Sequence, residues 1–409
     1  MYNIKDSPFD KMFRILSTHH KKIFLLIIII LYSNVFCNAK AIDNNKMLFW
    51  QTQVRKGANV FNKKVDIDLI KAAKEYNIGF IRLAPDKFES KKRDFLIGDA
   101  DNYQGLISED LKMLKNVLDM FNQQKIPVVL TMLSLPGSRW KQNNHDKDDL
   151  RLWKSQNFQK QAARFWQDLA KELKDHPAIV GYNILNEPHL ERLYDTNNSA
   201  IHNVEQSRVQ KDLFRFYSRM VDSIRQVDQE TPIILDSSSY ADPKTFEKLK
   251  PLSDNNVLYS FHIYEPFAYT NFKLNQGRFS YPGNIQSSDK NKLEYWNRDT
   301  LKSYIEPVSI FQKKHKIPSY RILVGEFGGH RSSKGLERYF QDLISIFNKY
   351  NWHFAVYGFR EDMWDGMDYE LGSEKLLWKD WEAIQNGIMK KNYLPDNPIF
   401  KVLRKEWSK

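Results

Sequence analysis

Two glutamates in short, distinctive contexts are the residues best suited to chemistry. Glu187 stands in Asn186-Glu187-Pro188, and Glu326 stands in Gly325-Glu326-Phe327-Gly328. Two carboxyl groups that face each other can cleave a glycosidic bond, because one protonates the leaving oxygen while the other meets the charge developing at the sugar carbon. The two groups must then hold protons with different affinities. Taken singly, each glutamate is as well explained by a structural role, and Asn-Glu-Pro also suits the start of a helix.

Four further polar residues stand at or near the ends of apolar runs, namely Arg82, Asp236, His262 and Tyr264. Arg82 is suited to keep one carboxylate ionised by charge pairing, and Tyr264 can donate a hydrogen bond to the same group. His262 can help to keep the other carboxyl protonated. The alternatives are a satisfied core histidine at His262 and an Asx turn at Asp236, which is the favoured interpretation of that aspartate.

The elements that must position these residues follow a regular rhythm, in which apolar runs alternate with amphipathic stretches. Several runs are nearly continuous in bulky and β-branched residues, as in parallel strands buried on both faces. The predicted strands are Gln53–Val60, Ile78–Leu83, Pro127–Leu133, Ile179–Leu185, Pro232–Leu235, Val257–Ile263, Ile322–Val324 and His353–Phe359. The predicted helices are Asp66–Tyr76, Ser108–Asn122, Asn157–Lys174, Glu205–Val227, Thr300–Lys314 and Leu336–Lys349.

This alternation predicts a single-domain (β/α)8 TIM barrel. The competing open, doubly wound sheet lacks its Gly-x-Gly-x-x-Gly after the first strand. Barrel enzymes keep their chemistry at the carboxyl ends of the strands, where the candidate residues fall. The long segments Tyr264–Trp296 and Phe359–Asn392 follow the sixth and eighth strands, so we expect them at the same face.

Composition sets further limits. Of the 409 residues, 42% are hydrophobic and 27% are charged, which excludes a disordered or fibrous chain. A single cysteine excludes a disulfide scaffold and a cysteine-rich zinc site. The net charge is +12, and the basic residues are scattered along the chain, usually in pairs beside acidic residues. This pattern indicates solvated helix faces and no nucleic-acid partner.

The N-terminus has the features of an export signal. Lys21 and Lys22 precede the apolar run Ile23–Tyr32, and small residues lead to Ala39. We therefore predict a signal peptide over residues 1–39, a catalytic domain over residues 40–409, and a secreted, extracellular or periplasmic protein. The run is much shorter than the roughly 20 residues of a membrane span, so no stable span is expected after cleavage. A retained N-terminal anchor is the alternative.

Several motifs resemble those of glycoside hydrolase family 5, the cellulase family of clan A. The stretch Gly181–Pro188 resembles the acid/base signature of that family, and His262-Ile263-Tyr264, Val324–Gly328 and Met363–Tyr369 resemble its motifs at strands six, seven and eight. The resemblance runs from about Trp50 to the C-terminus. It implies that Glu187 is the general acid/base and Glu326 the nucleophile of a retaining mechanism.

We expect substrate-binding roles for Arg82, Asn186, His262 and Tyr264. The same resemblance places Asn186 at the sugar 2-hydroxyl, and it makes Trp364, or Phe359, the stacking floor at the cleavage point.

One position departs from the family pattern. Leu133 stands where the family usually has a histidine, although the following Pro136-Gly137-Ser138 looks like the exo-β-1,3-glucanase branch. Loss of this polar contact leaves both carboxylates in place but puts the substrate preference in doubt, unless His145 fills the gap from a loop. Aromatic residues suited either to a sugar groove or to ordinary loop packing are Trp140, Trp153, Tyr269, Tyr281 and Trp296.

These observations predict a monomeric retaining hydrolase of β-glycosidic bonds in glucan-type polysaccharides or oligosaccharides, without cofactor or metal. The carboxyl groups of Glu187 and Glu326 should then lie about 5 to 5.5 Å apart. The alternatives are the same chemistry on a β-mannan or a glycolipid, and a non-catalytic carbohydrate-binding barrel, for which Leu133 is the only hint.

Overall fold

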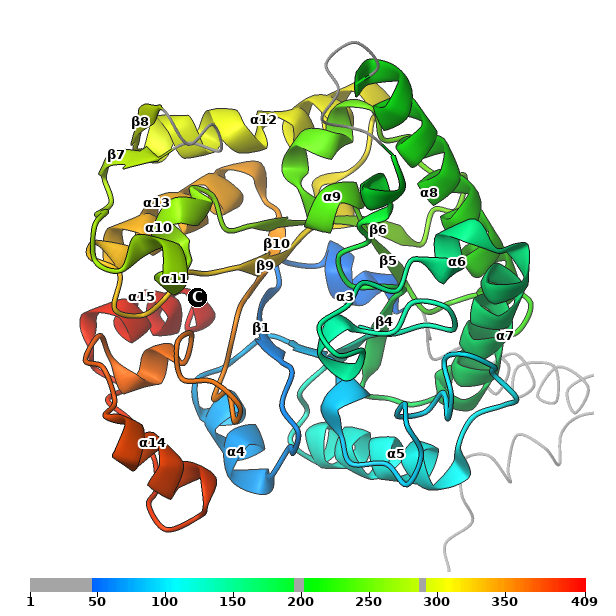
Figure 1. Cartoon of the computed structure of the whole chain (residues 1–409), viewed down its shortest axis with the longest axis horizontal. Helices are drawn as coiled ribbons and strands as arrows, with labels where there is room; N and C mark the ends of the chain where they lie inside the picture. Colours follow the sequence, from blue (N-terminus) through cyan, green and yellow to red (C-terminus); the bar gives the residue numbers. More distant parts are fainter. Residues whose placement is uncertain (1–45, 195–201, 287–291) are drawn as a thin grey trace, which may run out of the picture. The chain divides into compact units, whose positions relative to one another are not determined.

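Eight parallel strands form a closed barrel in the computed structural model, which describes residues 46–194, 202–286 and 292–409 (Figure 1). The strands follow one another around the barrel in the order β1-β2-β3-β4-β5-β6-β9-β10, and β10 pairs with β1. Their bounds are β1 (Lys56–Val60), β2 (Ile81–Leu83), β3 (Val128–Thr131), β4 (Ile179–Asn183), β5 (Ile233–Asp236), β6 (Val257–Ile263), β9 (Ile322–Phe327) and β10 (His353–Val356). The predicted barrel and all eight of its strands are confirmed.

The six predicted helices surround the barrel with small shifts at their ends. They are α4 (Ile67–Glu75), α5 (Ser108–Gln123), α7 (Gln156–Leu173), α8 (His202–Arg225), α12 (Arg298–His315) and α13 (Leu336–Tyr350). Two of them begin at capping side chains, since Asp66 accepts from the backbone of Leu69 and Asn297 accepts from that of Thr300.

Shorter elements complete the chain. They are α3 (Met47–Gln51), η1 (Pro85–Lys87), η2 (Lys141–Asn143), α6 (Arg151–Lys154), η3 (Leu190–Leu193), α9 (Ser238–Ala241), η4 (Pro243–Glu247), η5 (Ser319–Arg321), η6 (Tyr369–Leu371), α14 (Trp378–Gln385) and α15 (Pro398–Trp407). Residues 46–409 form one compact unit. Within the described part of the chain, none of the helices is both long and apolar enough to span a membrane. The predicted signal peptide, residues 1–39, lies outside the described residues.

At one end of the barrel the interior is apolar and is closed by helix α3. Its strand residues are Val129, Val180, Ile234, Leu258, Leu323 and Ala355. Trp50 of α3 is fully buried against Phe80, with ring centroids 5.3 Å apart, and its indole N–H donates to the carbonyl of Val180 at 2.9 Å. The hydrophobic plug at this end leaves the opposite end as the open mouth.

The layer towards the mouth is polar although it is equally buried. Its side chains are Asn59, Arg82, Thr131, Asn183, Asp236, His262 and Glu326. Gly325 makes room for this layer, because a Cβ atom there would lie 2.6 Å from Ser260 Oγ and 2.8 Å from His262 Nε2. Buried polar groups are stable only when they are paired, so this layer must be internally hydrogen-bonded.

The long segment after β6 folds as a separate rim. It contains α10 (Phe267–Thr270), α11 (Phe272–Asn275) and the antiparallel pair β7 (Gly283–Gln286) and β8 (Leu293–Trp296). Tyr269, Tyr281 and Trp296 are almost fully buried here, and both tyrosines pack edge-on against Tyr339. Ordinary packing is therefore the role of these three aromatic residues.

Replacement of the plug tryptophan tests the packing argument. Trp50→Ala removes a fully buried indole and its hydrogen bond, so we expect the free energy of unfolding in urea to fall by about 3 to 5 kcal/mol. Trp378→Ala is the matched control, because Trp378 is 74% exposed and should change stability by less than about 0.5 kcal/mol. Equal effects of the two changes would contradict the assignment of α3 as the plug.

Candidate active site

The two glutamates approach each other at the mouth of the barrel. Glu326 is the penultimate residue of β9, and Glu187 follows the end of β4. One carboxylate oxygen of each lies within 4.8 Å of the other. Their surroundings differ, because Glu326 is 4% exposed whereas the side chain of Glu187 is 27% exposed. Two acidic groups in unlike environments thus share one small space.

Glu326 is held by one donor on each oxygen. Arg82 Nη1 donates to Oε1 at 2.8 Å, and the hydroxyl of Tyr264 donates to Oε2 at 2.7 Å. Burial and then the nearby carboxylates raise the pKa of Tyr264 well above its usual value, so the phenol keeps the proton that it donates. A charged donor on one oxygen and a phenol on the other therefore fix the position of the Glu326 carboxyl group.

Arg82 is itself fixed by four other side chains. Its Nη1 donates to Asn59 at 2.9 Å, its Nε to Asn183 at 2.8 Å and its Nη2 to Asn186 at 2.6 Å. Asp236 lies 3.5 Å from Nη2 as a second ion-pair partner. Since Asn186 Oδ1 is used by Arg82, the amide N–H groups of Asn186 remain as donors at the mouth.

Glu187 has a different set of partners. His262 Nδ1 lies 2.8 Å from its Oε1 and shares a hydrogen bond with it. Burial raises the pKa of Glu187, the bond to His262 opposes this effect and the charge of Glu326 adds to it, with a net shift upwards. The backbone of Glu187 is left-handed (φ 51°), a costly conformation that its N–H bond to Asp236 helps to hold.

His262 connects the three carboxyl groups. Burial lowers the pKa of the imidazole, but Glu326, Asp236 and Glu187 raise it, and the net shift is upwards. Its Nε2 lies 3.4 Å from Asp236, and its Nδ1 lies 3.8 Å from Glu326. Asp236 is therefore a buried carboxylate that contacts His262, Arg82 and the backbone of Glu187. The expectation of an Asx turn for this residue was wrong.

Glu187, His262 and Glu326 also form the one group of acidic and imidazole side chains, within the described ranges, that is close enough to share a metal ion. Its members lie in or just after three different strands, β4, β6 and β9. Both oxygens of Glu326 are already occupied by Arg82 and Tyr264. A guanidinium at 2.8 Å also disfavours a second cation, so the donor set fits proton sharing better than metal binding.

Tyr357 is a residue of the site that the sequence analysis missed. It directly follows β10, is half-buried and packs edge-on against Phe61 at 5.3 Å. Burial raises its pKa well above the usual value, followed by the charges of Glu361 and Glu326. The predicted eighth strand extended to Phe359 and thus placed Tyr357 inside the strand; the end of β10 at Val356 puts it at the mouth.

Of the two residues expected to form the stacking floor, one is buried and the other is exposed. Phe359 is 2% exposed and packs against Tyr76 and Trp407, so its predicted sugar contact was wrong. Trp364 is 43% exposed, and its described contacts are with His330 and Gly366; none of them joins it to either glutamate. The other site residues predicted from the sequence, Arg82, Asn186, Glu187, His262, Tyr264 and Glu326, are all brought together.

A cavity of about 200 Å³ opens beside Glu187. Leu133, Trp140, Trp153 and Asn186 are among its lining residues. Leu133 packs with Phe61 and Ala84 into an apolar wall against which Trp140 and Tyr357 rest. The exposed His145 is not among the residues that line this cavity, so it does not replace the missing histidine there.

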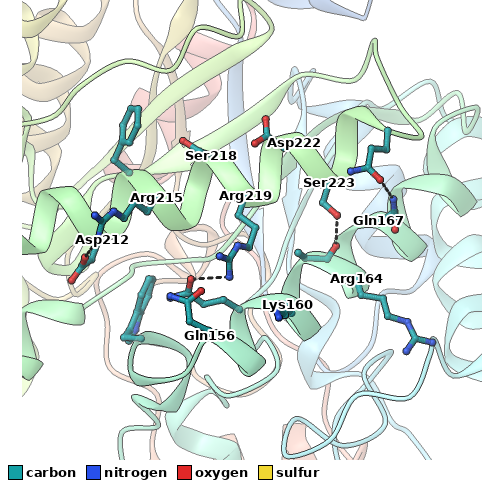
Figure 2. Close-up of a pocket in the computed structure, with 15 residues that line it drawn as sticks. Gln156, Lys160, Arg164, Gln167, Asp212, Arg215, Ser218, Arg219, Asp222 and Ser223 are labelled. Atoms are coloured by element: carbon teal, nitrogen blue, oxygen red, sulfur yellow. Dashed lines mark hydrogen bonds and ion pairs between the residues drawn. The ribbon is translucent and has the colours of Figure 1, made fainter.

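A larger hollow of about 1080 Å³ lies between α7 and α8 (Figure 2). Figure 2 shows Gln156, Lys160, Arg164 and Gln167 on one helix opposite Arg215, Arg219 and Asp222 on the other. Trp153 lines both hollows. None of the candidate catalytic side chains lines this groove, so the chemistry belongs to the smaller cavity.

Comparison with known proteins identifies the family. The model of the family described as cellulase (glycosyl hydrolase family 5) matches residues 43–362. The chain belongs to this family. Endoglucanase C of Acetivibrio thermocellus is 23% identical to it over 308 residues, which cover 69% of this chain and 80% of that protein.

Solved structures share the fold of this family 5 member. Endoglucanase Cel5A of the hyperthermophilic Thermotoga maritima superposes with a TM-score of 0.58 at 16% identity, covering 88% of this chain and 98% of that chain. Subunit Z of the Clostridioides difficile cellulose synthase gives 0.57 at 17% identity, covering 86% and 99%. Family membership makes the chain a cellulase-like glycosyl hydrolase.

The electrostatic coupling of the site can be measured directly. Asp236→Asn removes a negative charge that raises the pKa of both His262 and Glu187, so both values should fall. An NMR titration of the His262 imidazole tests this expectation. Asp254→Asn, which removes a partner of Arg225 elsewhere, is the matched control and should leave the His262 titration unchanged. An unchanged or raised pKa in the Asp236 variant would contradict the arrangement.

Proposed function

We propose that this family 5 member hydrolyses β-glycosidic bonds in a glucan-type chain with retention of configuration, using Glu187 as acid/base and Glu326 as nucleophile. The observation that carries the proposal is the approach of the two carboxylate oxygens to within 4.8 Å, with unlike partners on each. Retaining enzymes hold their carboxyl groups about 5 to 5.5 Å apart, whereas inverting enzymes need about 6.5 to 9.5 Å to admit a water.

In the first step, Glu187 protonates the glycosidic oxygen while Glu326 attacks the anomeric carbon. The raised pKa of Glu187 favours the protonated form that this step requires. Arg82 and Tyr264 hold the carboxylate of Glu326 in position until the ester bond forms. The sugar oxygen leaves with the proton from Glu187, and the sugar remains bonded to Glu326.

In the second step, Glu187 has become a carboxylate and takes a proton from water. The water oxygen attacks the anomeric carbon, the ester bond to Glu326 breaks, and Glu187 regains its proton. The free amide donors of Asn186 are placed to bind a sugar hydroxyl beside Glu326, and the ring of Tyr357 offers an aromatic face at the same end of the barrel. His262 tunes the proton affinity of Glu187 through their shared hydrogen bond.

The substrate class rests on the relatives and on the cavity wall. The curated relatives are named endoglucanases, and the related Cel5A has been solved with cellobiose and with mannotriose. A β-glucan is therefore the first candidate substrate and a β-mannan the second. The apolar wall at Leu133 offers no hydrogen bond to a sugar hydroxyl, which favours a substrate that does not need one there.

The N-terminal sequence supports an exported enzyme. A basic pair followed by the apolar run Ile23–Tyr32 and by small residues suits cleavage after Ala39 and release outside the cytoplasm. N-terminal sequencing of the exported protein should then begin at Lys40, and a start at Met1 would contradict the proposal.

A panel of polysaccharides decides between the substrates. Release of reducing ends should be fastest from a soluble β-glucan, slower from β-mannan, and measurable on aryl β-glycosides. Faster release from mannan would exchange the two candidates. Binding of these sugars without any release of reducing ends would replace the enzyme by a carbohydrate-binding barrel.

The two glutamates should fail in different ways when they are replaced. Glu326→Gln should abolish hydrolysis of every substrate, because no nucleophile remains. Glu187→Ala should cost about 10² to 10⁴-fold on polysaccharides but far less in the first step on aryl glycosides with good leaving groups, which need little protonation. Glu172→Gln, a surface change, is the matched control. Equal and small losses from both site variants would contradict the assigned roles.

A further inference from the structure

Trp364 is an exposed aromatic ring whose position is fixed from behind. The residue is 43% exposed, yet a Cβ atom at Gly366 would lie 2.2 Å from its Cζ2 atom and 2.8 Å from His330 Cδ2. The indole therefore lies directly across the backbone of Gly366 and against His330, with ring centroids 6.0 Å apart. One part of the ring is packed on protein and the rest faces solvent.

The loop that carries this ring is fastened to the end of β9. Arg331 is 1% exposed, and its Nη2 donates to the carboxylate of Asp365 at 2.6 Å. Its Nε donates to the carbonyl of Asp365 at 2.9 Å, its backbone N–H to the carbonyl of Gly366 at 2.8 Å, and its Nη1 to that of Gly372 at 2.8 Å. These bonds go to residues that follow Trp364 in the chain, and they hold the loop next to it in place without any ligand.

A second exposed ring lies against the same histidine. Phe272 is 38% exposed and stacks on His330, with centroids 4.3 Å apart and an interplanar angle of 27°. Burial, followed by the charge of Arg331, lowers the pKa of His330 to about 4, so the imidazole is neutral at pH 7. Phe272, His330 and Trp364 thus form an aromatic strip from three segments of the chain.

This aromatic strip lies close to the catalytic strand. His330 is four residues after Glu326, so their Cα atoms are at most about 14 Å apart. The backbone N–H of His330 donates to the carbonyl of Thr270 at 2.9 Å, which ties the rim segment that carries Phe272 to the same end of the barrel. A saccharide longer than the unit being cleaved can therefore reach the strip.

We propose that Trp364, with Phe272 beside it, is a stacking platform that binds a pyranose ring of the substrate chain away from the cleavage point. Apolar sugar faces stack on aromatic rings, and a ring that is already held still loses little entropy on binding. The inference rests on the proposed function, because its ligand is the same β-linked saccharide. It also moves Trp364 from the cleavage point to an outer subsite.

Native electrophoresis in gels that contain a soluble β-glucan measures platform binding without turnover. We expect the polysaccharide to retard the wild-type protein, and Trp364→Ala to weaken this binding about tenfold. Gly366→Ala should weaken it similarly, because its new methyl group displaces an indole that is still present. Trp364→Phe should restore part of the retardation. Trp378→Ala, which removes a 74% exposed tryptophan on α14, should migrate as the wild type.

Kinetics then separate this inference from the proposed function. The ratio of kcat/KM on the soluble β-glucan to that on a short aryl β-glycoside should fall about tenfold in Trp364→Ala and in Gly366→Ala, mainly through KM on the polymer. If both variants bind the polysaccharide as the wild type does and keep its ratio of kcat/KM values, the platform proposal is wrong, while the proposed hydrolase function stands. A wild-type protein that is inactive on both substrates would instead contradict the proposed function. The gel retardation would then still measure polysaccharide binding by the platform.

Discussion

The buried ion pair between Arg82 and Glu326 is the interaction on which the rest of the site depends. A guanidinium and a carboxylate taken out of water cost more than their mutual attraction returns unless every donor and acceptor is satisfied. Here the remaining N–H groups of Arg82 are bonded to Asn59, Asn183 and Asn186, and Tyr264 occupies the second oxygen of Glu326. Such a pair contributes little to stability but fixes the position and direction of one carboxyl group.

The second carboxyl is then different by necessity. Glu187 is hydrogen-bonded to His262 and lies in the field of Glu326, so burial and that field both favour its protonated form. Asp236 helps to hold the two glutamates in their different surroundings. It accepts a hydrogen bond from the backbone N–H of Glu187 and lies near both Arg82 and His262. The apolar plug around Trp50 confines this polar layer to the mouth, where substrate can reach it.

The sequence predicted the barrel because its strands are short apolar runs, and their positions along the chain were correct within a few residues. It also predicted the residues brought together at the mouth, since strand ends converge whatever the loops do. Boundaries were its weak point: extending the eighth strand to Phe359 hid Tyr357. The sequence did not predict the packing, because no pattern distinguishes the buried Phe359 from the exposed Trp364. The role of Asp236 depends on contacts with residues of three other strands, β2, β4 and β6.

The division of labour between the two glutamates is tested most directly by trapping the covalent intermediate. An aryl 2-deoxy-2-fluoro-β-glycoside with a good leaving group should form the first ester bond and then release it slowly, since the fluorine destabilises both transition states. Peptide mass mapping after brief reaction should find the sugar on the peptide that contains Glu326 and on no other. Attachment to Glu187, or turnover of substrate without any trapped sugar, would contradict the account.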